Sequence, residues 1–129
     1  MPNEKKLPRE LRMYEIDGVK YCVVVLKDNE IAHISWIYMK GDKNRWFNLR
    51  DDEAHINYCF TYPQYRGKGL FPKALMGAAR WLKERNFTRI FMDVHRGTTF
   101  MINSLKKVPR MKKIGTLTHW CFYRPKFRP

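Results

Sequence analysis

The chain has 129 residues, which fits a single domain over residues 1–129, and its composition of 44% hydrophobic and 15% aromatic residues is typical of a folded globular protein. No run approaches the roughly 20 apolar residues that a membrane-spanning helix needs. The polar residues 1–8 lack the apolar core of a secretion signal, so we expect a cytoplasmic protein.

The positive charge of the chain is concentrated in its second half. The formal net charge is +14, and residues 65–129 carry 16 basic side chains against two acidic ones, Glu84 and Asp93. Residues 1–64 carry 10 basic and 10 acidic side chains. Such an excess favours a polyanionic partner, which is nucleic acid, an acidic substrate or a phosphate-rich cofactor. Composition alone leaves these alternatives open.

Three β-rich runs follow a polar beginning. Residues 1–12 contain two prolines and are interpreted as a loosely held tail or a short leading element. The runs are rich in β-branched and aromatic residues, which predicts strands; they are Val19–Lys27, Ile31–Met39 and Ala54–Tyr62. Asp28 and Asn29 tolerate a left-handed backbone, so the first two strands are predicted to form a tight hairpin.

The periodicity changes after Gly69. Apolar residues recur at helical spacing over Leu70–Arg85, which predicts an amphipathic helix that ends at a left-handed Asn86. The next predicted element is a strand over Arg89–Val94. A second helix is predicted to begin at Thr98 or Thr99, to continue through Ile102, Asn103 and Leu105, and to be broken by Pro109. The last predicted element is a strand over Ile114–Tyr123.

The order of these elements predicts an α/β fold. Strands joined by helices pair in parallel, whereas the two strands of a hairpin pair antiparallel. The second half should therefore contain parallel pairs and the first half an antiparallel hairpin. We expect a mixed, partly antiparallel sheet in one domain.

The cysteines and histidines show no metal-ligand spacing. The three cysteines lie far apart among strand-forming residues, which favours buried free thiols in a reducing compartment; they are Cys22, Cys59 and Cys121. The four histidines, at positions 33, 55, 95 and 119, are equally scattered. We predict no metal site.

A strand, a loop with two glycines and a helix follow one another in residues 59–70. Glycine permits a tight turn and a close approach of backbone N–H groups to a ligand. The first N–H groups of a helix lack internal partners and bind phosphate, and Arg66 and Lys68 add positive charge. The glycine patterns of the P-loop and of dinucleotide-binding folds are absent. The segment is therefore either a phosphate-binding turn of another kind or an ordinary strand-to-helix turn with solvated basic residues.

The segment Gln64-Tyr65-Arg66-Gly67-Lys68-Gly69 resembles the phosphate loop of the GNAT superfamily of acetyltransferases, which reads Gln/Arg-x-x-Gly-x-Gly/Ala between a strand and a helix. Further along, the predicted strand, the helix with Asn103 and the segment Lys113-Ile114-Gly115 follow the order of that family. The resemblance covers residues 54–123. It implies a GNAT-like fold, in which a central pair of strands splays apart and helices flank the sheet.

The resemblance also implies acyl-CoA, in particular acetyl-CoA, as the cofactor. Its pyrophosphate is expected on the backbone of residues 66–70, and its pantetheine arm in the gap between the splayed strands. The implied cofactor-binding residues are Phe60, Thr61, Gln64, Tyr65, Arg66, Gly67, Lys68, Gly69, Leu70 and Asn103. The chain departs from the family at Phe71, where a small residue is common, and in having no tyrosine between Tyr65 and Tyr123 as the usual proton donor.

Acyl transfer to an amine needs a base for the proton of the ammonium and a donor for the oxyanion. The backbone N–H of Thr61 is a candidate donor. In the resembled family a group on the matching strand is often the base, and counting back from Thr61 places His55 at that level, with Glu53 on the same face. Free histidine titrates near neutrality, which suits the role. A structural His55 and a solvated Glu53 are the alternatives.

Tyrosines beside the loop are candidates for protonating the departing thiolate. Tyr62 and Tyr65 are the nearest in sequence. Tyr58 is expected on the face opposite His55, and His33 is expected to pack in the sheet or face solvent.

Two classes of function remain open from the sequence. One is an N-acyltransferase that acts on an amine of a small-molecule or sugar-like acceptor, or on a protein or polyanionic acceptor. The other is a nucleic-acid-binding module that uses the basic second half, although no recognised motif supports it. The region before the third strand is short, so helices that usually wall the acceptor site are reduced, and a second subunit of a homodimer is one way to supply them.

Overall fold

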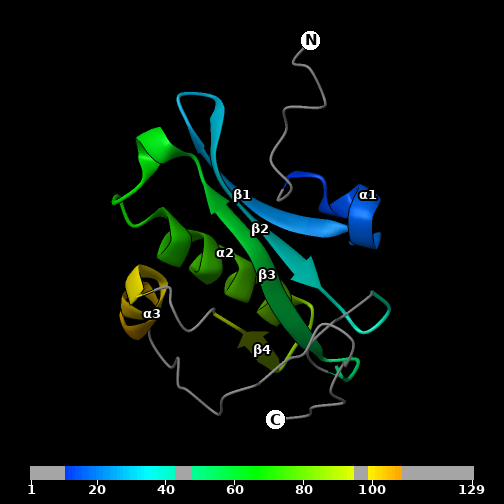
Figure 1. Ribbon diagram of the computed structural model, residues 1–129. Helices are drawn as coiled ribbons and strands as arrows, with labels where there is room; N and C mark the ends of the chain where they lie inside the picture. Colours follow the sequence, from blue (N-terminus) through cyan, green and yellow to red (C-terminus); the bar gives the residue numbers. More distant parts are fainter. Residues whose placement is uncertain (1–10, 43–47, 95–98, 109–129) are drawn as a thin grey trace.

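The computed structural model describes residues 11–42, 48–94 and 99–108 (Figure 1). The elements in chain order are α1 (Met13–Asp17), β1 (Tyr21–Lys27), β2 (Glu30–Tyr38), β3 (Glu53–Thr61), a 3-10 turn (Pro63–Tyr65), α2 (Leu70–Glu84), β4 (Arg89–Met92) and α3 (Thr99–Lys106). The four strands form one sheet in the order β1-β2-β3-β4. The mixed α/β fold is confirmed.

The predicted hairpin joins β1 and β2. Its two turn residues, Asp28 and Asn29, have φ angles of 51° and 66°, in the left-handed region that short polar side chains tolerate. The strands are antiparallel, with Lys27 opposite Glu30 at the turn. β1 begins at Tyr21 rather than at Val19, because α1 ends just before it at a left-handed Gly18.

The central strand β3 is antiparallel to β2 and parallel to β4, as expected from the helix between β3 and β4. Its pairing with β4 stops at Ile56 opposite Met92, whereas β3 continues to Thr61. Beyond that point, β3 has no β4 partner within the described residues. In the described structure, the edge of β3 that faces β4 therefore has no strand partner along the part that leads up to the loop before α2.

A β-bulge in β3 changes which side chains share a face. Phe60 lies opposite Ile34 and Asn57 opposite Trp36, so β3 carries one more residue than β2 between these pairs. Tyr58 has a φ of 52°, and its N–H donates to Oδ1 of Asn57 at 2.9 Å. The alternation of side chains is inverted across the bulge.

This bulge makes one prediction from simple counting wrong, namely that Tyr58 lies on the face opposite His55. Tyr58 lies on the same face as His55, since the ring of Tyr38 is 6.1 Å from the ring of Tyr58 and 6.3 Å from that of His55. Thr61 lies on the other face, beside His33. His55 and Thr61 therefore do not share a face, although six residues would place them together in a regular strand.

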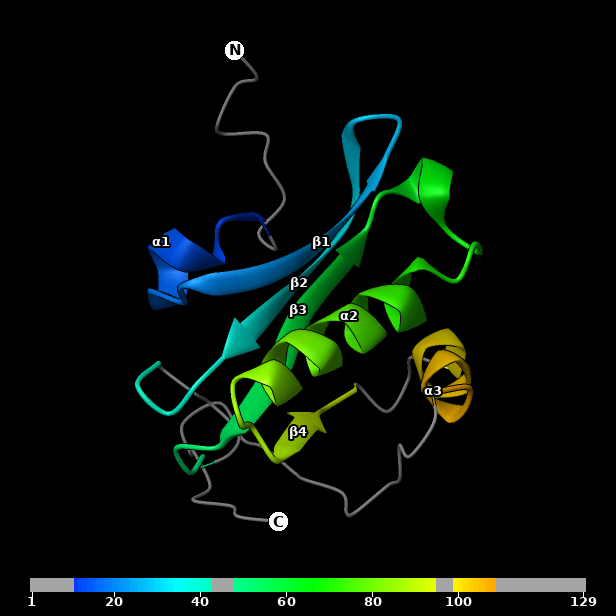
Figure 2. The same cartoon turned by 180° about the vertical axis from the view of Figure 1, so that it is seen from behind.

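The helix α2 covers one face of the sheet, with α3 beside it (Figure 2). Its buried stripe is Leu70, Phe71, Ala74, Leu75, Ala78 and Leu82. Part of this stripe packs on Ile37, Ala54 and Ile56, and burial of each large side chain contributes about 1.5–3 kcal/mol. The helix ends before Asn86, whose φ of 65° confirms the predicted left-handed stop.

The short helix α1 covers part of the opposite face. Met13 and Val19 are fully buried against Ile34, Trp36 and Tyr38 of β2. No helical period marked this five-residue element in the sequence, because tertiary packing rather than propensity stabilises so short a helix.

Several predictions fall on residues that the structure does not describe. They are the strand over Ile114–Tyr123, the break at Pro109, the segment Lys113-Ile114-Gly115, and the surroundings of His95, His119 and Cys121. Within the described ranges, none of the helices is long and apolar enough to cross a membrane.

Candidate active site

The junction between β3 and α2 has the geometry predicted for a phosphate-binding turn. Gly67 and Gly69 have φ angles of 76° and 72°, which glycine adopts without strain. A Cβ atom at either position would meet no atom within 4 Å, so the requirement for glycine is conformational here. Gly69 precedes the first residue of α2, and no side chain caps the helix. Backbone N–H groups at this end are therefore available to an anion.

The residue types of the first turn of α2 suit this role. Leu70 and Phe71 are buried, so their side chains leave the N-terminus clear. The burial of Phe71 shows how the chain accommodates a large residue where the family often has a small one. Pro72 has no N–H, but a helix makes no internal use of that N–H in its first turn.

The polar side chains of the loop contact the strands beside it. Nε of Arg66 donates to the carbonyl oxygen of Thr61 at 2.9 Å, and its guanidinium lies 5.8 Å from the ring of Phe60. Lys68 lies 5.9 Å from the ring of Tyr65, whose hydroxyl donates to Glu30 at 3.2 Å. These contacts fix the basic side chains near the backbone donors.

His33 connects the two ends of the loop. Its side chain is 1% exposed, and its ring nitrogens form hydrogen bonds of 2.5 Å with the hydroxyl of Thr61 and 2.7 Å with that of Ser35. Its ring also meets Phe71 edge-on, with centroids 5.7 Å apart. Burial lowers the pKa of His33 to about 4, so the ring is neutral at pH 7. It thus packs in the sheet, one of the two environments expected for it.

We expect substitutions of His33 to separate its two hydrogen bonds. The amide of His33→Asn lies near the position of Nδ1 and can retain the bond to Thr61, whereas that of His33→Gln lies near Nε2 and retains the bond to Ser35. His33→Gln, which loses the bond to Thr61, should therefore bind CoA about fivefold more weakly than His33→Asn, a difference that corresponds to the free energy of one hydrogen bond. Titration calorimetry with CoA measures the difference, and equal affinities of the two variants would contradict it.

A second polar pair lies near the other end of β3. Nε2 of His55 donates a hydrogen bond to Oδ1 of Asp93, which follows β4. The side chain of His55 is 1% exposed and that of Asp93 is 35% exposed. The carboxylate is therefore the member that solvent or a substrate can reach, with the imidazole behind it.

Tyr38 and Asp17 extend this polar region. The hydroxyl of Tyr38 donates to Oδ2 of Asp17 at 2.9 Å, and both side chains are buried. The ring of Tyr38 lies beside His55. Glu53 has different contacts, since it accepts from the N–H of Arg50 at 2.8 Å and lies 3.6 Å from the guanidinium of Arg89. These contacts engage Glu53 at the start of β3.

The remaining predicted site residues lie around the loop and on α3. Tyr62 is half-buried and meets the ring of Phe60 edge-on at 5.1 Å, and Gln64 is exposed in the 3-10 turn. Asn103 is exposed on α3. The structure therefore groups the loop residues. His55 lies farther along β3, since it is opposite Tyr38 whereas Thr61 is opposite His33, which is five residue steps or about 17 Å at 3.3 Å per residue.

Asp93 and His33 were not predicted as site residues. Each contacts a partner far away in the sequence, 38 residues for Asp93 with His55 and 28 residues for His33 with Thr61. One signal pointed to Asp93, which is one of only two acidic residues in the basic second half. Among the described residues, no three His, Cys, Asp or Glu side chains gather as metal ligands would.

The cysteines differ from the expectation of buried thiols. Cys22 is exposed because its strand lies at the edge of the described sheet, and Cys59 is partly buried. Both are free, and burial raises the pKa of Cys59 to about 12, so that thiol stays protonated at neutral pH.

Comparisons with known proteins agree with this geometry. A model of the acetyltransferase (GNAT) family matches residues 2–107. A comparison with curated protein sequences finds no significant match.

Solved structures with a similar fold include three acetyltransferases. One is an aminoglycoside acetyltransferase from an uncultured soil metagenomic sample in complex with trehalose, with a TM-score of 0.66 and 13% identity over 93% of this chain and 77% of that one. Another is the aminoglycoside N-acetyltransferase AAC(6')-Iy in complex with CoA, with a TM-score of 0.62 and 10% identity over 75% and 71%. The third is glucosamine-6-phosphate N-acetyltransferase from Arabidopsis thaliana, with a TM-score of 0.56 and 13% identity over 88% and 74%. At these identities the likeness concerns the fold.

Proposed function

The chain belongs to the GNAT acetyltransferase family, and from this premise we propose that it transfers the acetyl group of acetyl-CoA to a primary amine of a small-molecule or sugar-like acceptor. The observation that carries the proposal is the uncapped start of α2, preceded by Gly67 and Gly69 in the left-handed conformation. Main-chain donors at such a turn bind pyrophosphate.

The cofactor would extend from this turn along β3. Arg66 and Lys68 would add charge at the pyrophosphate, and the pantetheine arm would follow the edge of β3 beyond Ile56, where β3 has no β4 partner in the described structure. The amides of such an arm can pair with backbone groups of a strand edge as an added strand would. The thioester would then reach toward the region where β3 and β4 separate.

The pair of His55 and Asp93 lies where this separation begins, since Met92 is the last β4 residue paired with β3. In the proposed reaction Asp93 accepts a proton from the ammonium of the acceptor, and the neutral amine then attacks the thioester carbon. The C–N bond forms, the C–S bond breaks, and the CoA thiolate takes up a proton as it leaves. Tyr62 remains a predicted donor for that proton, and His55 and Glu53 remain predicted alternative bases.

Both the site and the fold relatives support the proposed acceptor class. Asp17 and Asp93 place carboxylates on the side of the sheet where His55 lies, in a protein whose net charge is +14. Carboxylates attract an ammonium group. Structures with a similar fold are named as acetyltransferases of aminoglycosides and of glucosamine-6-phosphate, which are amino sugars. This supports an amine on a sugar-like acceptor.

A thermal shift experiment tests the cofactor assignment. CoA and acetyl-CoA should raise the melting temperature, since a ligand at 100 times its Kd stabilises the folded state by about 2.7 kcal/mol. Single-stranded RNA and DNA of similar phosphate content are the control. Stabilisation by oligonucleotides alone, with a steep salt dependence, would contradict the proposal and favour the nucleic-acid-binding alternative.

A further inference from the structure

The outer edge of β1 is open among the described residues. β1 pairs only with β2, so its outward N–H and C=O groups have no strand partner there. Such an edge is a template for pairing with another chain, and proteins usually cover it or place charges along it.

Apart from Lys27 at its end, the side chains of β1 are uncharged and mostly apolar. Tyr21, Val24 and Leu26 of β1 are 45%, 40% and 57% exposed, and Ile31, which lies opposite Leu26 on β2, is 42% exposed. These four are more than half of the seven large hydrophobic side chains that are exposed in the described structure. Exposed apolar surface concentrated in this way marks an interaction site.

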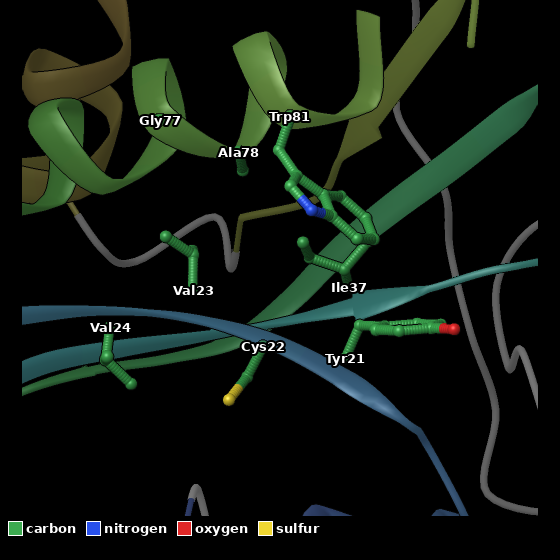
Figure 3. A pocket seen from close by; sticks show the side chains of 8 residues that line it. All are labelled: Tyr21, Cys22, Val23, Val24, Ile37, Gly77, Ala78 and Trp81. Carbon is green, nitrogen blue, oxygen red and sulfur yellow. The ribbon is translucent and has the colours of Figure 1, made fainter. Parts of the chain in front are cut away.

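A pocket of about 420 Å³ opens beneath the same edge (Figure 3). It lies between β1 and α2, where Val23 points from the strand toward the helix, Trp81 points from the helix toward Tyr21, and the small residues Gly77 and Ala78 leave space. Cys22 points to the other face of the sheet (Figure 3). None of the predicted site residues lines the pocket, so it is separate from the candidate active site.

We propose that this edge binds β1 of a second copy of the chain, in an antiparallel pair with a two-fold axis at Val24. A two-fold axis perpendicular to the sheet joins the two sheets with their corresponding faces on the same side. Residues that lie opposite each other across the two β1 strands must therefore come from the same face of the sheet. β1 runs from residue 21 to residue 27, and only the register with Val24 opposite Val24 pairs all of its residues. Val23 then lies opposite Val25, on the side of the pocket.

The charges beside β1 complement each other in this register. Lys20, immediately before the strand, lies opposite Asp28 of the second copy, and the two-fold axis repeats this pair at the other end. Both residues are exposed in the chain itself. Lys27 lies opposite Tyr21, where its apolar stem can cover the exposed ring. A shift of the register by two residues shortens the pairing and separates Lys20 from Asp28.

The register can be tested with Leu26→Cys, because residue 26 lies opposite the native Cys22 of the second copy. Cys22 is free and exposed. Within one chain the two positions are four residues apart, about 13 Å, which is too far for a disulfide. Mild oxidation should therefore convert most of this variant to a covalent dimer on a non-reducing gel.

The wild type and the double variant Cys22→Ser/Leu26→Cys are matched controls, and both should remain monomeric on that gel. Cys59 and Cys121 are present in all three proteins, so they give the same background. A cross-link that forms equally without Cys22 would overturn the register.

Light scattering during gel filtration tests the assembly itself. The wild type should elute at twice the mass of one chain, and Val24→Lys, which places two ammonium groups against each other at the axis, should raise the dimer dissociation constant at least about tenfold. Val24→Thr retains the β-branched shape and should dimerise like the wild type. A wild-type protein that is monomeric at all concentrations would overturn the proposal. CoA binding is measured in a separate experiment, so the dimer and the cofactor assignment are tested independently.

Discussion

Asp93→Asn should lower kcat by about 10²–10⁴-fold, the range for loss of a general base. Asparagine has nearly the same shape and can still accept the hydrogen bond from Nε2 of His55, but its amide cannot take up a proton. The KM for acetyl-CoA should change little, because the phosphate loop lies at the other end of β3. Steady-state rates with an amino-sugar acceptor over a range of pH measure both quantities.

The companion variant His55→Gln distinguishes a catalytic pair from a structural one. Its amide nitrogen can donate to Asp93 as Nε2 does, so the carboxylate stays oriented while the imidazole is lost. Residues that act as a unit have non-additive effects, so the double variant should be little slower than Asp93→Asn alone. A wild-type kcat for Asp93→Asn, with the melting temperature unchanged, would remove Asp93 from the reaction and leave His55 and Glu53 as the predicted bases.

Gly69→Val should weaken CoA binding about tenfold or more. Gly69 has a φ of 72°, which a β-branched residue rarely adopts and which costs about 1–3 kcal/mol. The chain can relieve this strain by changing the turn, which would move the N–H donors at the start of α2 away from the phosphates. A loss of about 1.4 kcal/mol in binding free energy corresponds to a tenfold weaker affinity for CoA. Titration calorimetry with CoA gives the Kd directly.

Gly69→Asn is the matched control, because asparagine tolerates the left-handed conformation and no atom lies within 4 Å of the added Cβ. It should bind CoA more tightly than Gly69→Val. Gly41→Val, at a glycine without a positive φ, should bind like the wild type. An unchanged Kd in Gly69→Val would show that the phosphate loop is not the cofactor site.

The elements that the sequence predicted well are those with local causes. The hairpin turn at Asp28 and Asn29, the helix from Leu70 and its stop at Asn86 each depend on residues within a few positions of one another. α1 escaped prediction because a helix of five residues is stabilised by Met13 in a distant cluster rather than by its own period.

The phosphate loop belongs to the same local class. Two glycines, a preceding strand and a following helix are contiguous in the chain, and the backbone conformation of Gly67 and Gly69 agrees with what their sequence context implied. The sequence by itself therefore determined the family, which the family model confirms, and it predicted the cofactor site, because the phosphate loop is a short contiguous motif.

Only the tertiary structure decided which side chains meet away from that loop. The bulge at Tyr58 inverts the faces of β3, and no local pattern announces it because pairing with β2 sets the register. The contacts of His55 with Asp93 and of His33 with Thr61 join residues 38 and 28 positions apart. Such contacts form only when the whole sheet assembles, which is why Asp93, the more exposed partner of His55, could not be found by counting along one strand.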